Sequence, residues 1–511
     1  MGSSPRKAAR QEVKFVPFGV VSLEDILKLP DPYFILPEDA RRQLNYIDRY
    51  VRHPELGCRT VVLEEHYIDR DYIEDHSVFY SKSLTNYPNY CTRVHFFSLE
   101  PTQLQSEITR IRSLRSSAEE HVFWEECGRL SKRHYIGFAV IKPLPGCPVG
   151  RTVLRCLQED SKKGHLRKFK CACDFDAHLL GLRFTVKGLP FQQQDLGVSA
   201  CATTALWISL QRAAQLEHAG AATPAHITMR ASQFALPFGR PMPSEGLSLD
   251  QMCQAIQSLG YSPNLHRAEG SSFEVTRALL FSSVSSGFSP VLVMENVDGS
   301  VRHAVAVAGV AVSQHTTAPP VTGVRHRSAD LRGLYVHDDR CGPYLKATIA
   351  ERKGNFLVRY ELFDAQEEWT LTHILTPLHA KIRLSFGELY RAGADALTSD
   401  VQAFLNASGE NESTLWRSRI YRSHVYVDEL LQRVGASRLV EQLCRKVRLS
   451  RYIGVIRFDA PSLDTFDVLL DTTSTERNLN CLAVLQLQST NVHTAELCRF
   501  IAGRYGGQYI H

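Results

Sequence analysis

The sequence has no apolar stretch long enough to cross a membrane. Its longest smooth apolar run, residues 304–312, is nine residues long, whereas a membrane-spanning helix needs about 20. This run therefore predicts a buried strand in a protein without a membrane anchor. The first 15 residues are charged and lack the apolar core of a signal peptide, and Arg6 breaks the N-myristoylation pattern that begins at Gly2. We therefore expect a cytoplasmic protein.

The thirteen cysteines lack the regular spacing of a disulfide framework or a structural zinc site. Their number is odd and they are scattered, which predicts free, mostly buried thiols in a reducing compartment. One group of possible metal ligands is bunched, but it lacks the paired Cys-x2-Cys geometry of structural zinc, and alternation along a strand explains it equally well. We therefore expect no metal and no other cofactor. The group comprises Cys171, Cys173, Asp174, Asp176 and His178.

The sequence also lacks a strong charge of one sign. Lys and Arg number 59 against 54 Asp and Glu, a net charge of +5 at neutral pH, which does not favour nucleic-acid binding by itself. Within residues 416–451, however, nine Arg or Lys are opposed by only three acids. A solvated helix face explains this bias, and docking of an acidic partner is the alternative. A second basic run, residues 162–170, has the same two interpretations.

Length and composition predict three globular domains of mixed α+β structure. The chain has 511 residues, of which 44% are hydrophobic and 22% charged, enough to bury several cores. We expect a disordered N-terminus over residues 1–19 and an N-terminal α+β domain over 20–185. A central domain over 186–378 and a C-terminal α/β region over 379–511 complete the expected organisation.

The segment around Cys201 is the most informative part of the chain. Small residues at 197–202 lead into a stretch with apolar side chains at helical spacing between 206 and 216. This pattern predicts an amphipathic helix with Cys201 at its N-terminus, where free N–H groups and the positive end of the helix dipole favour a thiolate. The upstream glutamines at 192–194 can donate to an oxyanion together with the Cys201 N–H.

A histidine and two aspartates complete a possible catalytic set. The sequence predicts a hairpin over residues 290–312, and His303 begins its second strand, where an imidazole can serve a nearby thiol as base and then as acid. A further strand ends at Asp338 and Asp339, and a carboxylate there can accept from the imidazole and fix its tautomer. A buried structural role is the alternative for each of these side chains.

The order Cys201, His303, Asp338 resembles that of papain-like cysteine peptidases, most closely the bacteriocin-processing peptidases that cut after a double glycine. The likeness spans residues 190–345 and includes a Gln before the cysteine, a capped helix within 246–260, and the strands that carry the histidine and the aspartate. It implies a papain-like fold for the central domain. It also implies a cysteine peptidase for a peptide or protein substrate, cutting after small residues such as a Gly-Gly tail.

The resemblance implies a role for each residue of the set. Cys201 is the nucleophile, His303 the general base and Asp338 the acid that orients the imidazole. The family's aspartate is usually followed by proline, whereas Asp339 follows here, so Asp339 is the reserve for the same role.

The oxyanion donor departs from the family pattern by one position. The family's glutamine usually lies six residues before the cysteine, but Asp195 holds that position here and Gln194 lies seven before. We expect Gln194 to be the donor, with one additional residue in the loop. Gln193 is its rival.

Two other functions fit the same residues. One is a thiol acyltransferase on the same fold, in which an amine or thiol replaces water as the acceptor. The other is a non-catalytic interaction protein that binds its partners through the large flanking domains. Partitioning of the acyl-enzyme between water and an added nucleophile distinguishes an acyltransferase from a peptidase. The reactivity of Cys201 distinguishes a non-catalytic protein from an enzyme.

Overall fold

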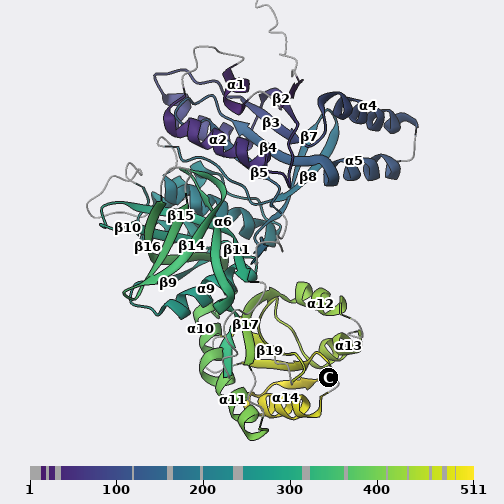
Figure 1. Cartoon of the computed structure of the whole chain (residues 1–511), viewed down its shortest axis with the longest axis vertical. Helices are drawn as coiled ribbons and strands as arrows, with labels where there is room; N and C mark the ends of the chain where they lie inside the picture. The colour runs from purple at the N-terminus through teal and green to yellow at the C-terminus, as the bar shows by residue number, and fades with distance from the viewer. Residues whose placement is uncertain are drawn as a thin grey trace, which may run out of the picture.

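The computed structural model has three parts that follow one another along the long axis of the molecule, each built on a sheet of five or more strands (Figure 1). Helices and strands occur in each part, which confirms the mixed α+β class. The structure describes residues 13–18, 22–28, 36–117, 120–157, 165–195, 200–233, 246–313, 323–361, 366–409, 413–433, 437–459, 463–474, 480–488 and 491–511.

The N-terminal part is built on a five-stranded antiparallel sheet whose strands lie in chain order. The expectation that residues 1–19 are disordered is wrong for residues 13–18, because β1 pairs with β2 and Phe18 is fully buried. Residues 1–12 lie outside the described chain. The strands are β1 (Val13–Pro17), β2 (Thr60–Tyr67), β3 (Cys91–Phe97), β4 (Tyr135–Ile141) and β5 (Val149–Leu154).

Helices and a hairpin cover the two faces of this sheet. One face packs against α4, α5 and the β7–β8 hairpin, and the other packs against α1 and α2. Both faces are therefore buried, although the sheet is antiparallel. The elements are α1 (Leu23–Lys28), α2 (Glu38–Val51), α3 (Arg70–Val78), the 3₁₀ turn η1 (Tyr80–Lys82), α4 (Pro101–Ser117), α5 (Glu120–His134), β7 (Cys173–Leu179) and β8 (Leu182–Gly188).

Four of the five bunched possible metal ligands lie along β7, and Cys171 lies in the turn before it. Cys173 faces the core, whereas Asp174, Asp176 and His178 are exposed on the opposite face of the strand. The alternation of a strand therefore accounts for the spacing, and this interpretation is confirmed.

The central part contains a closed ring of antiparallel strands. The ring closes because β10 pairs with both β11 and β16, and β6 (His165–Lys168) and β9 (Tyr261–Arg267) extend it on the outside. The expected hairpin of β10 and β11 is confirmed. The ring strands are β10 (Val291–Asn296), β11 (Arg302–Ser313), β13 (Leu331–Asp338), β14 (Gly342–Arg352), β15 (Asn355–Glu361) and β16 (Gln366–His379).

Helix α6 (Cys201–Glu217) packs against this ring and is buried on all sides over most of its length. Every residue from Ala202 to Gln211 is buried, so the expected amphipathic helix is wrong. The reason is that α6 contacts the ring strands β10, β11 and β16 and also the helices α7 and α8. The other helices of the central part are α7 (Pro224–Ala231), α8 (Leu249–Ser258) and α9 (Phe273–Ser285).

The C-terminal part is a six-stranded sheet in the order β12-β17-β18-β19-β20-β21, antiparallel in the middle and parallel at both edges. The strands are β12 (Gly323–His326), β17 (Ser413–Arg422), β18 (Tyr452–Asp459), β19 (Phe466–Asp471), β20 (Cys481–Gln486) and β21 (Gln508–Ile510). The helices are α10 (Phe386–Arg391), the π-helix η3 (Ala392–Leu397), α11 (Thr398–Ala407), α12 (Ser423–Leu431), α13 (Ser437–Lys446) and α14 (Val492–Tyr505).

Two strands cross the expected domain boundaries. Strand β12 comes from the middle of residues 186–378 but forms the edge of the C-terminal sheet. Strand β6 comes from residues 20–185 but pairs with β11 of the central ring. Backbone pairing therefore joins each part to its neighbour across the expected boundaries at 185 and 378. No helix in the described residues combines the length and apolarity needed to cross a bilayer.

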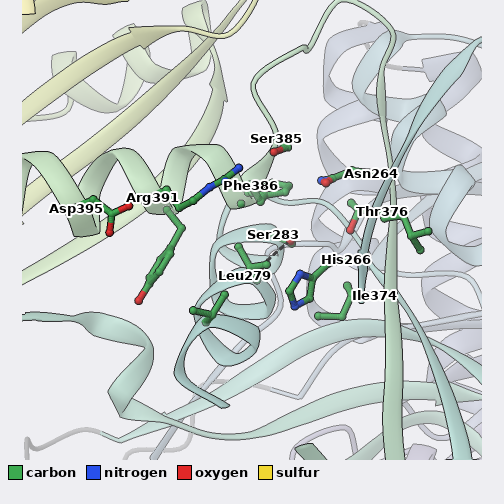
Figure 2. A pocket seen from close by; sticks show the side chains of 14 residues that line it. Asn264, His266, Leu279, Ser283, Ile374, Thr376, Ser385, Phe386, Arg391 and Asp395 are labelled. Atoms are coloured by element: carbon green, nitrogen blue, oxygen red, sulfur yellow. Dashed lines mark hydrogen bonds between the residues drawn. The ribbon is translucent and has the colours of Figure 1, made fainter. Parts of the chain in front are cut away.

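A cavity of about 560 Å³ lies where the central and C-terminal parts meet. Figure 2 shows Leu279 and Ile374 of the central part on one side of it, with Arg391 and Asp395 of the C-terminal part on the other. The two parts meet through apolar side chains such as Leu279 and Phe386, and polar and charged groups also line the cavity between them.

Helix α2 holds the loop that follows β13. Gln43 Nε2 donates a hydrogen bond of 2.6 Å to the main-chain oxygen of Asp339. The ring of Tyr46 lies so close to Gly342 that an added Cβ would be 2.2 Å from its Cδ1 atom. Only glycine fits at position 342 without displacing the ring, so the N-terminal part sets the path of this loop.

We expect Gly342→Ala to lower the free energy of unfolding by about 1–3 kcal/mol, because overpacking of a filled core costs this much. Gly128→Ala is the control, since Gly128 lies in α5 and an added Cβ there meets nothing within 4 Å. Urea unfolding of the two variants measures the difference. Equal stabilities would contradict the close packing of Tyr46 on Gly342.

Candidate active site

Cys201 is the first residue of α6, as the sequence predicts. The preceding residue, Ala200, has an extended backbone and contributes no side-chain cap. The first N–H groups of a helix have no partner within the helix and form the positive end of its dipole. Cys201 is half-buried whereas the residues that follow it are buried. The thiol is therefore half-buried at the positive end of the helix dipole.

His303 and Asp338 come from neighbouring strands of the central ring. His303 is the second residue of β11 and Asp338 the last of β13, and these strands pair in antiparallel register. The pairing brings the two side chains together, with His303 Nε2 3.1 Å from Asp338 Oδ2. Both are buried, with 4% of His303 and none of Asp338 exposed. The carboxylate thus fixes the ring through Nε2.

Cys201 lies close enough to His303 that its thiol is among the groups that, after Asp338, raise the pKa of the imidazole. Because Nε2 faces Asp338, Nδ1 is the ring nitrogen left for the thiol. The structure therefore brings together the three residues that the sequence predicts, in the order thiol, imidazole, carboxylate. In such an arrangement the histidine exchanges a proton with the thiol, and the carboxylate holds the ring in the required tautomer.

The charges around His303 favour its protonated form. Burial alone lowers the pKa of this imidazole, but Asp338, with smaller contributions from Cys201 and Asp339, raises it to about 10. Burial likewise acts to raise the pKa of Asp338, but His303 and Arg340 hold it below its usual range. An imidazolium beside an ionised carboxylate is the result at neutral pH, and a cation next to Cys201 stabilises a thiolate.

Asp339 fits the role of orienting acid less well than Asp338. Its Oδ1 atom is 3.7 Å from His303 Nε2, and neither carboxylate oxygen has a hydrogen-bond partner within the described chain. Burial, together with the charge of Asp338, raises the pKa of Asp339 to about 7 despite the nearby His303. Asp339 is thus the more easily protonated carboxyl of the two.

Arg340 supports the carboxylate from the other side. Its main-chain N–H donates to Asp338 Oδ1 at 2.9 Å, and Nη2 lies 3.3 Å from Asp338 Oδ2 and 3.0 Å from Glu367 Oε2. Arg340 Nε is also 3.3 Å from His303 Nε2. A protonated Nε2 donates to Asp338 and cannot accept from Arg340, so this last contact is a hydrogen bond only when the imidazole is neutral.

Trp369 packs beside His303 and Arg340. Its ring centroid is 5.5 Å from that of His303, and the Arg340 guanidinium lies 5.1 Å above the ring. The indole N–H donates to Glu367 Oε2 at 3.1 Å. Sequence reasoning missed Arg340, Glu367 and Trp369. For Arg340, its position two residues after Asp338 was the local signal that could have found it. Glu367 and Trp369 lie in β16, where the sequence carries no recognisable motif.

His303, Asp338 and Asp339 also place three possible metal ligands within 4.8 Å of one another. This donor set fits a metal ion poorly. The Arg340 guanidinium lies 3.3 Å from both Asp338 Oδ2 and His303 Nε2, and its positive charge competes with a cation for the same atoms. The arrangement suits a proton-transfer set better than a metal centre.

The glutamines before Cys201 differ in their contacts. The Gln193 side chain accepts from Val149 N at 3.3 Å and donates to Gly146 O at 3.5 Å, so its amide is occupied by the N-terminal part. Gln194 is half-buried and lines a cavity of about 390 Å³ that also contains Arg340. Gln194 makes no hydrogen bond to Cys201 within the described residues, and the linking residues 196–199 lie outside them.

Asp195, which holds the position of the family's glutamine, has a structural role. It is buried, accepts from the hydroxyl of Tyr80 and lies 3.3 Å from Lys142 Nζ. Both partners belong to the N-terminal part, so this pair anchors the loop before Cys201 to that part. A buried charge paired in this way is not available to donate to an oxyanion.

No protein-family model matches the chain, and no curated protein matches its sequence significantly.

We expect Asp338→Asn to slow the alkylation of Cys201 by iodoacetamide at least about tenfold, because an amide cannot stabilise the imidazolium. Asp339→Asn should change the rate less than about threefold, since the carboxylate of Asp338 remains in place. Peptide mass spectrometry of the labelled protein measures both rates. If Asp339→Asn abolished the reactivity and Asp338→Asn did not, the two assignments would have to be exchanged.

Asp339→Asn should also change how stability depends on pH. The folded-state pKa of about 7 lies above the value of about 3.9 for an unfolded chain, so Asp339 binds its proton more tightly in the native state. Its contribution to stability is present at low pH and falls as the pH rises from about 4 to about 7. The amide mimics the neutral acid, so the melting temperature of the variant relative to wild type should rise between about pH 5 and about pH 8.

Proposed function

We propose that the protein is a cysteine peptidase in which Cys201 is the nucleophile. The observation that carries this proposal is the position of the His303 imidazole, which faces the ionised Asp338 and lies close enough to Cys201 for the thiol to contribute to its raised pKa. A thiol at a helix N-terminus, next to an oriented imidazolium, has the features of an activated nucleophile.

The proposed reaction cleaves an amide bond in two steps. The Cys201 thiolate attacks the carbonyl carbon, and the π electrons move to the oxygen. When the tetrahedral intermediate collapses, the imidazolium of His303 gives its proton to the leaving amine, and a thioester remains. Water then attacks the thioester while His303 takes its proton, so that the acid product leaves and the thiolate–imidazolium pair is restored.

Two groups are proposed to stabilise the oxyanion. The Cys201 N–H is at the start of α6, where it has no partner within the helix. Gln194 is the proposed side-chain donor, because the Gln193 amide is already bonded to Gly146 and Val149.

A papain-like core is the proposed fold of the central part. In support, the nucleophile helix is buried against an antiparallel ring whose strands supply the histidine and the aspartate. This matches the order and setting that the sequence resemblance implies. The N-terminal part is then proposed as an integral support of the site, because Gln43 and Tyr46 of α2 contact the loop after Asp338.

The proposed substrate is a peptide or protein cut after small residues. Small groups surround the nucleophile: Ala200 and Ala202 flank it, and a Cβ added at Gly246 would lie 3.8 Å from the Cβ of Ala200. Their size leaves room for a main chain to approach the thiol. The double-glycine preference itself comes from the sequence resemblance.

Cys201→Ala should abolish cleavage of a proteome-derived peptide library and shift the melting temperature by less than about 2 °C, because one half-buried sulfur is lost. Mass spectrometry of the products also reports the residue before the cut. Added hydroxylamine separates the alternatives: hydrolysis products alone indicate a peptidase, and predominant capture by the amine indicates an acyltransferase. Full cleavage by Cys201→Ala would refute the proposal.

The pH dependence of labelling tests the activated pair without a substrate. Because the pKa of His303 is about 10, the imidazolium is present at neutral and mildly acidic pH. At about pH 6 an ordinary thiol is almost fully protonated, so Cys201 should react with iodoacetamide at least about tenfold faster than the other cysteines. His303→Ala should remove this advantage. Labelling of Cys201 no faster than that of the other cysteines would instead favour the non-catalytic alternative.

A further inference from the structure

A second cavity between the central and C-terminal parts is lined by an excess of positive charge. Its volume is about 190 Å³. Four cationic side chains and one acid line it, which leaves three positive charges in excess. The charged residues are Lys170, Arg212, Arg419, Arg422 and Glu429.

The cationic residues come from both parts of the molecule. Arg212 lies in α6, the helix that begins with Cys201, and Lys170 follows β6. Arg419 and Arg422 lie in β17, the strand of the C-terminal sheet that Figure 1 shows at the boundary with the central part. The cavity is therefore formed only when the two parts are together.

Burial acts to raise the pKa of Glu429, but Arg457, with a smaller contribution from Arg419, holds it below its usual value, so this one acid offsets only part of the positive charge. The carboxylate of Glu429 already accepts from Arg457 Nη1 at 3.1 Å and from the hydroxyl of Tyr421 at 3.0 Å. Within the described chain, neither Arg419 nor Arg422 forms a salt bridge. The charge of each is therefore left without a carboxylate partner in a partly buried position.

The arginines satisfy only part of their hydrogen-bonding capacity with neutral groups. Arg212 Nε donates to Gly287 O at 2.9 Å, Arg419 Nη1 donates to the hydroxyl of Tyr421 at 2.8 Å, and Arg422 Nη1 donates to Leu216 O. The Nε atoms of Arg419 and Arg422 are buried and have no acceptor among the described residues. Buried donors of this kind are uncommon in folded proteins unless a ligand, ion or water completes them.

We propose that this junction cavity binds the phosphate group of a small phosphorylated ligand. A phosphate dianion offers several acceptor oxygens, and guanidinium groups bind such oxygens with paired N–H donors. The volume is below the range of roughly 300–1,000 Å³ that encloses drug-sized ligands, so one phosphate group fits and the remainder of the ligand lies outside. The concave shape favours such a ligand over the acidic partner considered as the alternative for residues 416–451.

The bound group bridges the nucleophile helix and the C-terminal sheet. Arg212 holds it from α6, and Arg419 and Arg422 hold it from β17. Binding therefore stabilises the contact between the two parts, and it does so independently of the proposed peptidase chemistry.

Isothermal titration of the full chain with inorganic phosphate at constant ionic strength and near-neutral pH tests the proposal. The wild type should bind one phosphate per chain. Arg419→Gln and Arg422→Gln should each weaken binding at least about tenfold, because a charge-assisted bidentate contact is lost. Arg445→Gln is the matched control: it removes the same charge from an exposed arginine that pairs with Glu441 at 2.7 Å, and it should bind as the wild type does.

Further arms keep the test decisive. Pyrophosphate in place of phosphate distinguishes the sources: tighter binding through the same arginines indicates a diphosphate-bearing ligand, and equal or weaker binding indicates a monoester. If a Gln variant does not fold, Arg419→Lys and Arg422→Lys replace it. Each keeps the positive charge but loses the paired N–H donors of the guanidinium group, so weaker binding is again expected. The proposal is overturned if the wild type binds no phosphate up to about 10 mM, or if the cavity variants bind as Arg445→Gln does.

Discussion

The carboxylate of Asp338 has no contact with solvent, and a charge in such a place is costly unless neighbouring groups compensate it. His303 supplies a positive charge on one side, and Arg340 supplies a main-chain N–H and a guanidinium on the other. Arg340 is held in turn by Glu367, and Trp369 packs beside His303 and Arg340. These supports come from β11, β16 and the loop after β13, so the site exists only when the ring of strands is closed.

The N-terminal part is continuous with this ring. Leu44 and Ile47 of α2 belong to the same hydrophobic core as Trp207 of α6 and the ring strands. Tyr50 of α2 stacks on Tyr344, with ring centroids 5.4 Å apart, just beyond the loop that carries Asp338 and Arg340. Helix α6 is buried over most of its length because it lies within this shared core, between the ring strands and the helices α7 and α8.

Local sequence patterns predicted the helix and strands that carry the site. The burial of these elements and the contacts that support the site depend on residues far apart in the sequence. The start of α6 at Cys201, the hairpin that places His303 and the strand that ends at Asp338 follow from residue spacing and turn chemistry. The burial of α6 did not follow, because its second covering layer comes from helices elsewhere in the chain. Nor did the support of Arg340 by Glu367, since 27 residues separate these partners. The anchoring of the loop before Cys201 by Asp195, which pairs with Tyr80 and Lys142, did not follow from the one-residue offset of Gln194.

Strand β12 has a consequence for the ancestry of the molecule. When two domains are joined by end-to-end fusion, all strands of each sheet come from one continuous stretch of sequence. Here the edge strand of the C-terminal sheet, Gly323–His326, lies between two strands of the central ring and pairs with β17 about 90 residues further on. The central and C-terminal parts are therefore interlaced. Neither can be inherited or exchanged as an independent domain without leaving an unpaired sheet edge.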